Sequence, residues 1–172
     1  MLFNKLKTIK VIILDVDGVL TDGSILVNEK GDQLRTFNVK DGYAMQLAEK
    51  VGLKIWVITG GKSEGVMSRL KGLGLSEIHM GVQNKRKLLG ELLTQHGISA
   101  EYAMYVGDDM PDYEVMQDVE IAVCPVDAVE EIKALAHYMS PKAGGKGVVR
   151  DIVEKTLKMQ GKWYVESQLK SV

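Results

Sequence analysis

Residues 11–23, from which the rest of the chain is interpreted, are Val11-Ile12-Ile13-Leu14-Asp15-Val16-Asp17-Gly18-Val19-Leu20-Thr21-Asp22-Gly23. The four apolar residues at the start predict a short, fully buried strand. Two carboxylates follow it, and because side chains alternate along an extended backbone, Asp15 and Asp17 are expected on one side. Gly18 allows a sharp turn and the close approach of a ligand. Since neighbouring carboxylates repel each other, a divalent cation is the simplest compensation, and a plain Asp-Gly turn is the alternative.

Composition limits the class of protein. The chain has 172 residues, the length of one domain, and we expect a single domain over 1–172. Lys and Arg number 22 against 23 Asp and Glu, so charge gives no reason to expect nucleic acid or an anionic membrane as a partner. Cys124 is the single cysteine, which excludes an intramolecular disulfide and a zinc cluster. Because no run is apolar enough for a membrane span or a signal peptide, we expect a cytoplasmic protein.

Strands and helices alternate along the chain. Strand patterns are expected at 11–14, 53–58, 76–80, 102–106 and 120–123, with an edge strand at 137–139. Helical patterns are expected at 41–51, capped by Asp41, then from 63 to 72, at 85–96, at 127–136, capped by Asp127, and after 147. This order predicts an α/β fold with a doubly wound, mainly parallel sheet and helices on both faces. Ligands bind such sheets at the carboxyl ends of the strands.

A β-hairpin is expected directly after the acidic strand end. Two strand-like runs flank the polar loop Asn28-Glu29-Lys30-Gly31-Asp32 within residues 22–38. The hairpin is placed to act as a flap over the site, and its composition fits an oligomer contact equally well.

The other polar groups follow strand ends or open a helix. Thr59-Gly60-Gly61 follows the second buried strand, where a hydroxyl and backbone amides near a helix start suit a phosphate. Asp108 and Asp109 follow a later strand. Lys85 opens a helix, where the helix dipole disfavours a cation, so a role in neutralising phosphate charge competes with a solvated helix start.

These groups suit phosphoryl transfer to a carboxylate. Carboxylate and carbonyl oxygens favour Mg²⁺, which commonly completes its shell with a substrate phosphate. Asp15 would attack phosphorus in line and form an aspartyl-phosphate. Asp17 would protonate the departing alkoxide and then take a proton from the hydrolytic water.

The motifs Asp15-x-Asp17-Gly18, Thr59-Gly60, Lys85 and Gly107-Asp108-Asp109-x-x-Asp112 resemble, in this order, the haloacid dehalogenase superfamily of phosphatases. Val39-Lys-Asp-Gly-Tyr, Ile58-Thr-Gly-Gly-Lys-Ser-Glu and Gly144-Gly-Lys-Gly-Val-Val-Arg narrow the resemblance to the capless 3-deoxy-D-manno-octulosonate 8-phosphate phosphatases. The resemblance extends from about Lys10 to Trp163. It implies a haloacid dehalogenase-like Rossmannoid fold and a Mg²⁺-dependent phosphoric monoester hydrolase of lipopolysaccharide sugar biosynthesis.

The resemblance also implies residue roles. Asp15 is then the nucleophile and Asp17 the acid/base, while Thr59 and Lys85 bind phosphate. Mg²⁺ is held by the Asp15 carboxylate, the Asp17 carbonyl and Asp108, with Asp109 and Asp112 in support. The resemblance further implies a homotetramer that assembles through the hairpin and in which a neighbour's C-terminal segment, here about 161–172, covers the site. Trp163 and Tyr164 either pack on such a neighbour or fray with the tail.

One position departs from the family pattern. Many relatives carry Arg or Glu after Thr-Gly, where this chain has Gly61 followed by Lys62, so these two residues bear on the choice of sugar. Arg69 and Arg150 are further candidates for binding a carboxylate of the sugar acid, with surface ion pairs as the alternative.

Three alternative functions remain open at this point. A related nine-carbon, sialic-acid-like 9-phosphate is the alternative substrate. A phospho-receiver domain combines similar residues, but its acceptor Asp follows a middle strand. A non-catalytic regulatory domain is the third.

Overall fold

The computed structural model describes residues 2–163, and the predicted tail beyond Trp163, including Tyr164, lies outside the described residues. The elements of this part are α1 (Leu2–Lys5), β1 (Val11–Leu14), β2 (Leu26–Val27), β3 (Gln33–Leu34), α2 (Val39–Lys50), β4 (Lys54–Ile58), α3 (Glu64–Gly72), β5 (Glu77–His79), α4 (Lys85–His96), β6 (Ala103–Val106), α5 (Tyr113–Met116), β7 (Ile121–Cys124), α6 (Glu130–Leu135), β8 (Tyr138–Met139) and α7 (Val148–Met159). Short 3₁₀ turns at Ala100–Tyr102 and Met110–Asp112 connect some of them.

The main sheet confirms the predicted α/β architecture. Its strands follow the order β5-β4-β1-β6-β7-β8, and each neighbouring pair is parallel. β1 lies between β4 on one side and β6 on the other, so the chain reverses its winding direction there. The carboxyl end of β1 is therefore the topological switch point, where open parallel sheets bind ligands.

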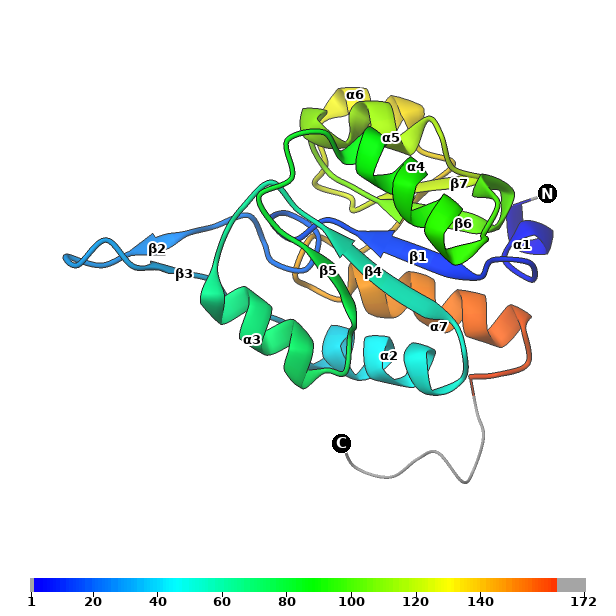
Figure 1. The fold of residues 1–172 in the computed structure, drawn as a ribbon, viewed down its shortest axis with the longest axis horizontal. Coiled ribbons are helices and arrows are strands. Elements are labelled where there is room, and N and C mark those ends of the chain that lie inside the picture. Colours follow the sequence, from blue (N-terminus) through cyan, green and yellow to red (C-terminus); the bar gives the residue numbers. More distant parts are fainter. Residues whose placement is uncertain (1, 164–172) are drawn as a thin grey trace.

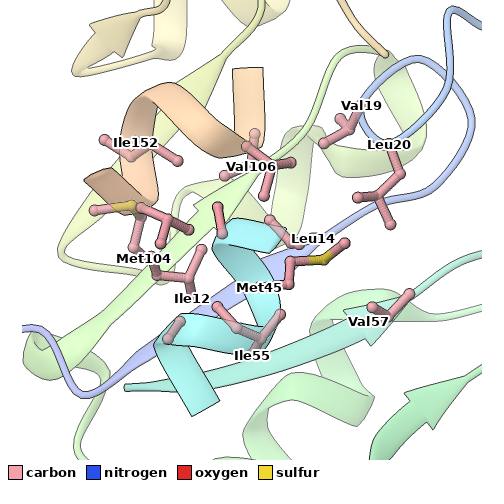
Figure 2. Close-up of a cluster of buried hydrophobic side chains, with 14 of the residues drawn as sticks. Ile12, Leu14, Val19, Leu20, Met45, Ile55, Val57, Met104, Val106 and Ile152 are labelled. Atoms are coloured by element: carbon pink, nitrogen blue, oxygen red, sulfur yellow. The ribbon is translucent and has the colours of Figure 1, made fainter. Parts of the chain in front are cut away.

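Helices cover both faces of the sheet (Figure 1), with α2, α3 and α7 on one face and α4, α5 and α6 on the other. Side chains alternate along the strands, so each strand contributes to both cores. On β1, Ile12 and Leu14 pack with α2 and α7 (Figure 2), whereas Val11 and Ile13 pack with α4 to α6. Burial of β1 on both faces explains its continuous apolar sequence.

The predicted hairpin forms, but its paired strands are shorter than expected. β2 and β3 make a separate two-stranded antiparallel sheet that extends away from the body of the domain (Figure 1). Its apolar side chains are largely exposed, with 68% of the surface of Leu26, 59% of Val27 and 53% of Leu34 accessible.

Two predicted helix caps are wrong. α2 starts at Val39 with Asn38 as its cap, and Asp41 lies buried in the first turn, where it accepts a hydrogen bond from the Arg150 amide at 2.6 Å. α6 has no side-chain cap, and Asp127 instead accepts from the Gly144 amide at 3.0 Å. Both carboxylates thus bind the segment around Gly144–Arg150, far away in the sequence, rather than their own helix.

This segment packs against the loop that follows β1. The Gly145 amide donates to the Val19 carbonyl at 2.9 Å. A Cβ atom on Gly144 would lie 1.9 Å from the Gly18 carbonyl oxygen, so the two backbones approach more closely than any side chain allows. The loop bearing Asp17 therefore rests on Gly144.

We expect Gly144→Ala to destabilise the fold by about 2 kcal/mol or more, because backbone atoms must shift to make room for the methyl group. Urea unfolding followed by circular dichroism measures the change. Gly90→Ala is the matched control, since nothing lies within 4 Å of its added Cβ on α4. That variant is expected to gain about 0.5 kcal/mol by its greater helix propensity. Equal stability of the two variants would contradict the close contact.

Candidate active site

A pocket of about 400 Å³ opens at the carboxyl ends of β1, β4 and β6. It brings together most of the residues selected from the sequence. Its lining consists of Asp15, Asp17, Gly23, Thr59, Gly60, Gly61, Val82, Gln83, Lys85, Asp108, Asp109 and Pro111.

Asp15 and Lys85 form the buried centre of the pocket. The Asp15 amide continues the ladder of β1 by donating to the Val106 carbonyl, so the position of the side chain is fixed by the sheet. Lys85 Nζ lies 3.1 Å from Asp15 and 2.7 Å from Asp112, and its side chain is only 5% exposed. Burial alone would lower the pKa of Lys85, but Asp15 and Asp112 outweigh it and raise the pKa. Lys85 is therefore a charged, buried lysine rather than a solvated helix start.

Asp112 is fully satisfied and organises its neighbours. Its Oδ1 accepts from Lys85 Nζ at 2.7 Å and from the Tyr105 hydroxyl at 2.8 Å. Its Oδ2 accepts from the Asp108 amide at 3.2 Å. Because its oxygens already have these donors, Asp112 positions Lys85 and Asp108.

Asp15 and Asp108, unlike Asp112, each have a carboxylate oxygen without a hydrogen-bond donor among the described residues. These oxygens, Asp15 Oδ1 and Asp108 Oδ1, are both buried. Burial, followed by the charge of Asp112, raises the pKa of Asp15 to about 6 and that of Asp108 to about 8. Carboxylate oxygens of Asp15, Asp108 and Asp112 all lie within 4.8 Å of one another. This donor set fits a hard divalent cation, which would supply the missing partners and the missing positive charge.

Gly18 and Thr59 shape the two sides of the pocket. A Cβ atom on Gly18 would lie 1.9 Å from Asp108 Oδ2, so glycine is what allows Asp108 to approach the loop after β1. Thr59 is 4% exposed, and its Oγ1 accepts from the Gly61 amide at 3.3 Å. The turn after β4 thus presents Thr59 and Gly60 to the pocket ahead of α3.

Asp17 has a partner that the sequence interpretation missed. Arg35, one residue after β3, donates through Nε to Asp17 Oδ1 at 2.7 Å and through Nη2 to Oδ2 at 3.2 Å. Its side chain is 5% exposed, whereas that of Asp17 is 32% exposed. The polar hairpin sequence carried no signal for this contact.

Other predicted residues lie at the edge of the pocket or outside it. Asp109 lines the pocket, but it is exposed and caps the turn before α5 by accepting from the Met110 amide. The Lys62 side chain lies over Gly81 and is not among the lining residues. Arg69 contacts Gly42 on α2, and Arg150 pairs with Glu154 and stacks on Trp163 at 4.4 Å. The structure thus does not bring Arg69 or Arg150 into the pocket of the same chain.

The chain is similar to characterised proteins. Residues 72–152 match the model of the haloacid dehalogenase-like hydrolases. The 3-deoxy-D-manno-octulosonate 8-phosphate phosphatase of Escherichia coli K12 is 39% identical over 158 residues, covering 92% of this chain and 84% of that protein. The phosphatase of the same name from Yersinia pestis is 34% identical over 154 residues, covering 90% of this chain and 82% of that protein.

Solved structures extend the similarity to the fold. The Moraxella catarrhalis 3-deoxy-D-manno-octulosonate 8-phosphate phosphatase superposes with a TM-score of 0.91 at 35% identity, covering 94% of this chain and 92% of that chain. That structure contains a magnesium ion, a phosphate ion and a KDO molecule. The Yersinia pestis structure gives a TM-score of 0.91 at 32% identity, covering 94% of this chain and 87% of that chain.

The raised pKa values predict a pH-dependent stability of the metal-free protein. The pKa of Asp15, about 6, and that of Asp108, about 8, both lie above the ordinary 3.8. At pH values between 3.8 and these raised values, the folded state therefore binds more protons than the unfolded state. The contribution of these two groups to stability is therefore greatest in acid, and it should fall by several kcal/mol as the pH rises from 4 to 8. Urea unfolding in EDTA at several pH values measures this.

Asp108→Asn is the matched variant, because it removes the charge and keeps the shape. It should flatten the upper part of the pH dependence, and Mg²⁺ should raise the stability of the unaltered protein most at pH 8. An Asp108→Asn variant with the same pH dependence as the unaltered protein would contradict the assigned crowding of charge.

Proposed function

The chain belongs to the haloacid dehalogenase-like hydrolases, in the family of the 3-deoxy-D-manno-octulosonate 8-phosphate phosphatases, and from this premise we propose that it hydrolyses that sugar-acid phosphate in a Mg²⁺-dependent reaction. The products are the free sugar acid, an intermediate of lipopolysaccharide sugar biosynthesis, and phosphate. The observation that carries the proposal is the cluster of Asp15, Asp108 and Asp112 around the buried Lys85, beside Thr59, at the switch point of the sheet.

Asp15 is the proposed nucleophile. It follows the central strand, is held in place by the β6 ladder and faces the pocket, so its position is fixed before substrate binds. Attack of one carboxylate oxygen on phosphorus, with departure of the sugar oxygen on the opposite side, gives an aspartyl-phosphate. Asp17 gives a proton to the leaving oxygen and later takes one from the water that hydrolyses the intermediate.

Thr59 and Lys85 are the proposed phosphate ligands. The Lys85 ammonium has three donors, two of which point to Asp15 and Asp112, so one remains for a phosphate oxygen. Thr59 offers its hydroxyl from the other side of the pocket, with Gly60 and Gly61 leaving space for the ligand. Together they offset the repulsion between the phosphate and Asp15.

Asp15 and Asp108 are the residues proposed to hold Mg²⁺, together with the Asp17 carbonyl, while Asp112 orients them. When bound, the ion supplies positive charge that draws the phosphate toward the carboxylates. Asp109, which caps the next turn, is left with a supporting role.

A homotetramer assembled through the hairpin is part of the proposal. Exposed Leu26 and Leu34 are paired across the hairpin and form an apolar surface that association would cover, and exposed Val27 lies on its opposite face. The pocket is open on this chain alone, and a neighbouring copy would exclude water from it.

We expect phosphate release that depends on Mg²⁺ and favours 3-deoxy-D-manno-octulosonate 8-phosphate over a panel of other sugar phosphates, including a nine-carbon sugar-acid 9-phosphate. A colorimetric phosphate assay with Mg²⁺ and with EDTA measures it. Preference for the nine-carbon ester would keep the mechanism and change the substrate. Absence of Mg²⁺-dependent release from every ester would overturn the phosphatase function.

Asp15→Asn is the control for the nucleophile, because it preserves size and removes the attacking charge. Activity should fall below detection while the far-ultraviolet circular dichroism spectrum stays unchanged. A variant that keeps most of its activity would remove Asp15 from its role.

Light scattering should give a tetramer for the unaltered chain. The double variant Leu26→Glu/Leu34→Glu should shift it to smaller species, because these residues face each other across the hairpin and like charges there repel association. Lys30→Glu at the exposed loop tip is the matched charge change and should leave the assembly intact. A fully active monomer of the unaltered chain would exclude the tetramer.

A further inference from the structure

The Arg35–Asp17 ion pair lies at the edge of the pocket and has no part in the phosphatase mechanism given above. Asp17 must point an oxygen at the sugar oxygen that leaves. In the structure, however, its two oxygens each accept from a different nitrogen of the Arg35 guanidinium, at 2.7 and 3.2 Å. A bidentate pair of this kind fixes the direction of the carboxylate plane as well as its place.

Arg35 is built into the domain from the hairpin. β3 ends at Leu34, and Arg35 is the next residue, so alternation places the exposed Leu34 and the inward Arg35 on opposite sides. The Arg35 side chain is 5% exposed, and its Nη1 also donates to the Gln33 carbonyl at 3.4 Å. A guanidinium that is shielded from water and makes its two-nitrogen contact with one carboxylate is organised for that carboxylate.

Gly61 provides the space for this pair. A Cβ atom at residue 61 would lie 3.4 Å from Asp17 Oδ2 and 3.8 Å from Arg35 Nη2. Gly61 does not have a positive φ, so its backbone conformation is open to other residues. A Cβ atom at these distances is in ordinary van der Waals contact, so a larger side chain at residue 61 would have the ion pair as its direct neighbour.

We propose that Arg35 is a positioning residue that holds the Asp17 carboxylate in a resting orientation and releases one oxygen to the leaving group when the anionic substrate binds. The inference rests on the proposed phosphatase function and adds to it. The substrate's own oxyanions compete with Asp17 for the guanidinium, so one Asp17 oxygen is freed as the phosphate enters beside Thr59 and Lys85. Gly61 is part of the same arrangement, because a residue without a side chain leaves the Arg35–Asp17 ion pair intact.

The choice of leaving group separates this role from a purely structural one. An alkyl sugar oxygen needs a proton to depart, whereas the nitrophenolate of p-nitrophenyl phosphate does not. The ratio kcat/KM reports the steps up to departure of the leaving group, so it isolates the half-reaction in which Asp17 acts as an acid. A well-placed general acid contributes about 10²–10⁴-fold to such a step.

The experiment compares kcat/KM for both esters in the unaltered enzyme and in Arg35→Met. We expect a loss of about tenfold or more for the sugar-acid phosphate and less than about threefold for p-nitrophenyl phosphate, because only the first needs an oriented acid. An equal loss for both esters would assign Arg35 to substrate binding or folding and overturn the proposal. No loss for either ester would also overturn it.

Arg86→Met is the matched control. Arg86 makes the same two-nitrogen contact with Asp118, at 2.6 and 2.9 Å, but at the surface, where its side chain is 52% exposed. The Arg86→Met variant removes an ion pair of the same geometry and should leave kcat/KM for both esters unchanged. An unaltered enzyme that releases phosphate from neither ester would instead overturn the proposed function, which is a different result.

Gly61→Gln tests the same contact from its other side. The longer side chain should part Arg35 from Asp17 and produce the same selective loss for the sugar-acid phosphate. Because both changes break one contact, Arg35→Met/Gly61→Gln should lose no more than the larger single effect. Losses that multiply in the double variant would show independent roles and contradict the proposal.

Discussion

The site depends on the repulsion among carboxylates that the sheet forces together. Asp15 and Asp108 follow neighbouring parallel strands, so the carboxyl ends of β1 and β6 bring them to one edge, and Asp112 joins them from the next turn. Burial removes the water that would screen their charges, which is why the pKa of Asp108 rises to about 8. Lys85 compensates for part of this charge, and a divalent cation and a phosphate complete the balance in the proposed reaction. Metal, lysine and substrate are thus parts of one electrostatic arrangement.

The fold is predictable from the sequence because its signals are local. Buried parallel strands have continuous apolar runs, as in Val11–Leu14, and helices between them keep a helical spacing of apolar residues. The pocket followed from topology, since groups after parallel strands meet at one edge of the sheet. Asp15, Asp17, Thr59 and Asp108 were expected at this edge and line the pocket there, whereas the burial of Lys85 between two carboxylates is visible only in the structure.

The sequence could not give contacts that depend on how distant segments dock. Asp41 and Asp127 have the local pattern of helix caps, yet each accepts from an amide in the segment Gly144–Arg150. A carboxylate near a helix start satisfies whichever free amide the tertiary structure brings closest, and nothing in a single sequence ranks a local amide above a distant one. Arg150 shows the same limit: its side chain is fixed by Glu154 and Trp163 rather than by the pocket.

The hairpin shows how two functions share a short segment. In an extended strand, neighbouring residues face opposite ways, so Leu34 is exposed while Arg35 reaches Asp17. The surface proposed to pair with another copy and the side chain proposed to orient the acid/base are then one residue apart on the same backbone. Any shift of the hairpin moves both, because β2 and β3 have two residues each and all four are exposed. The position of Asp17 is therefore tied to whatever fixes the hairpin, and in the proposed tetramer that is the neighbouring subunit.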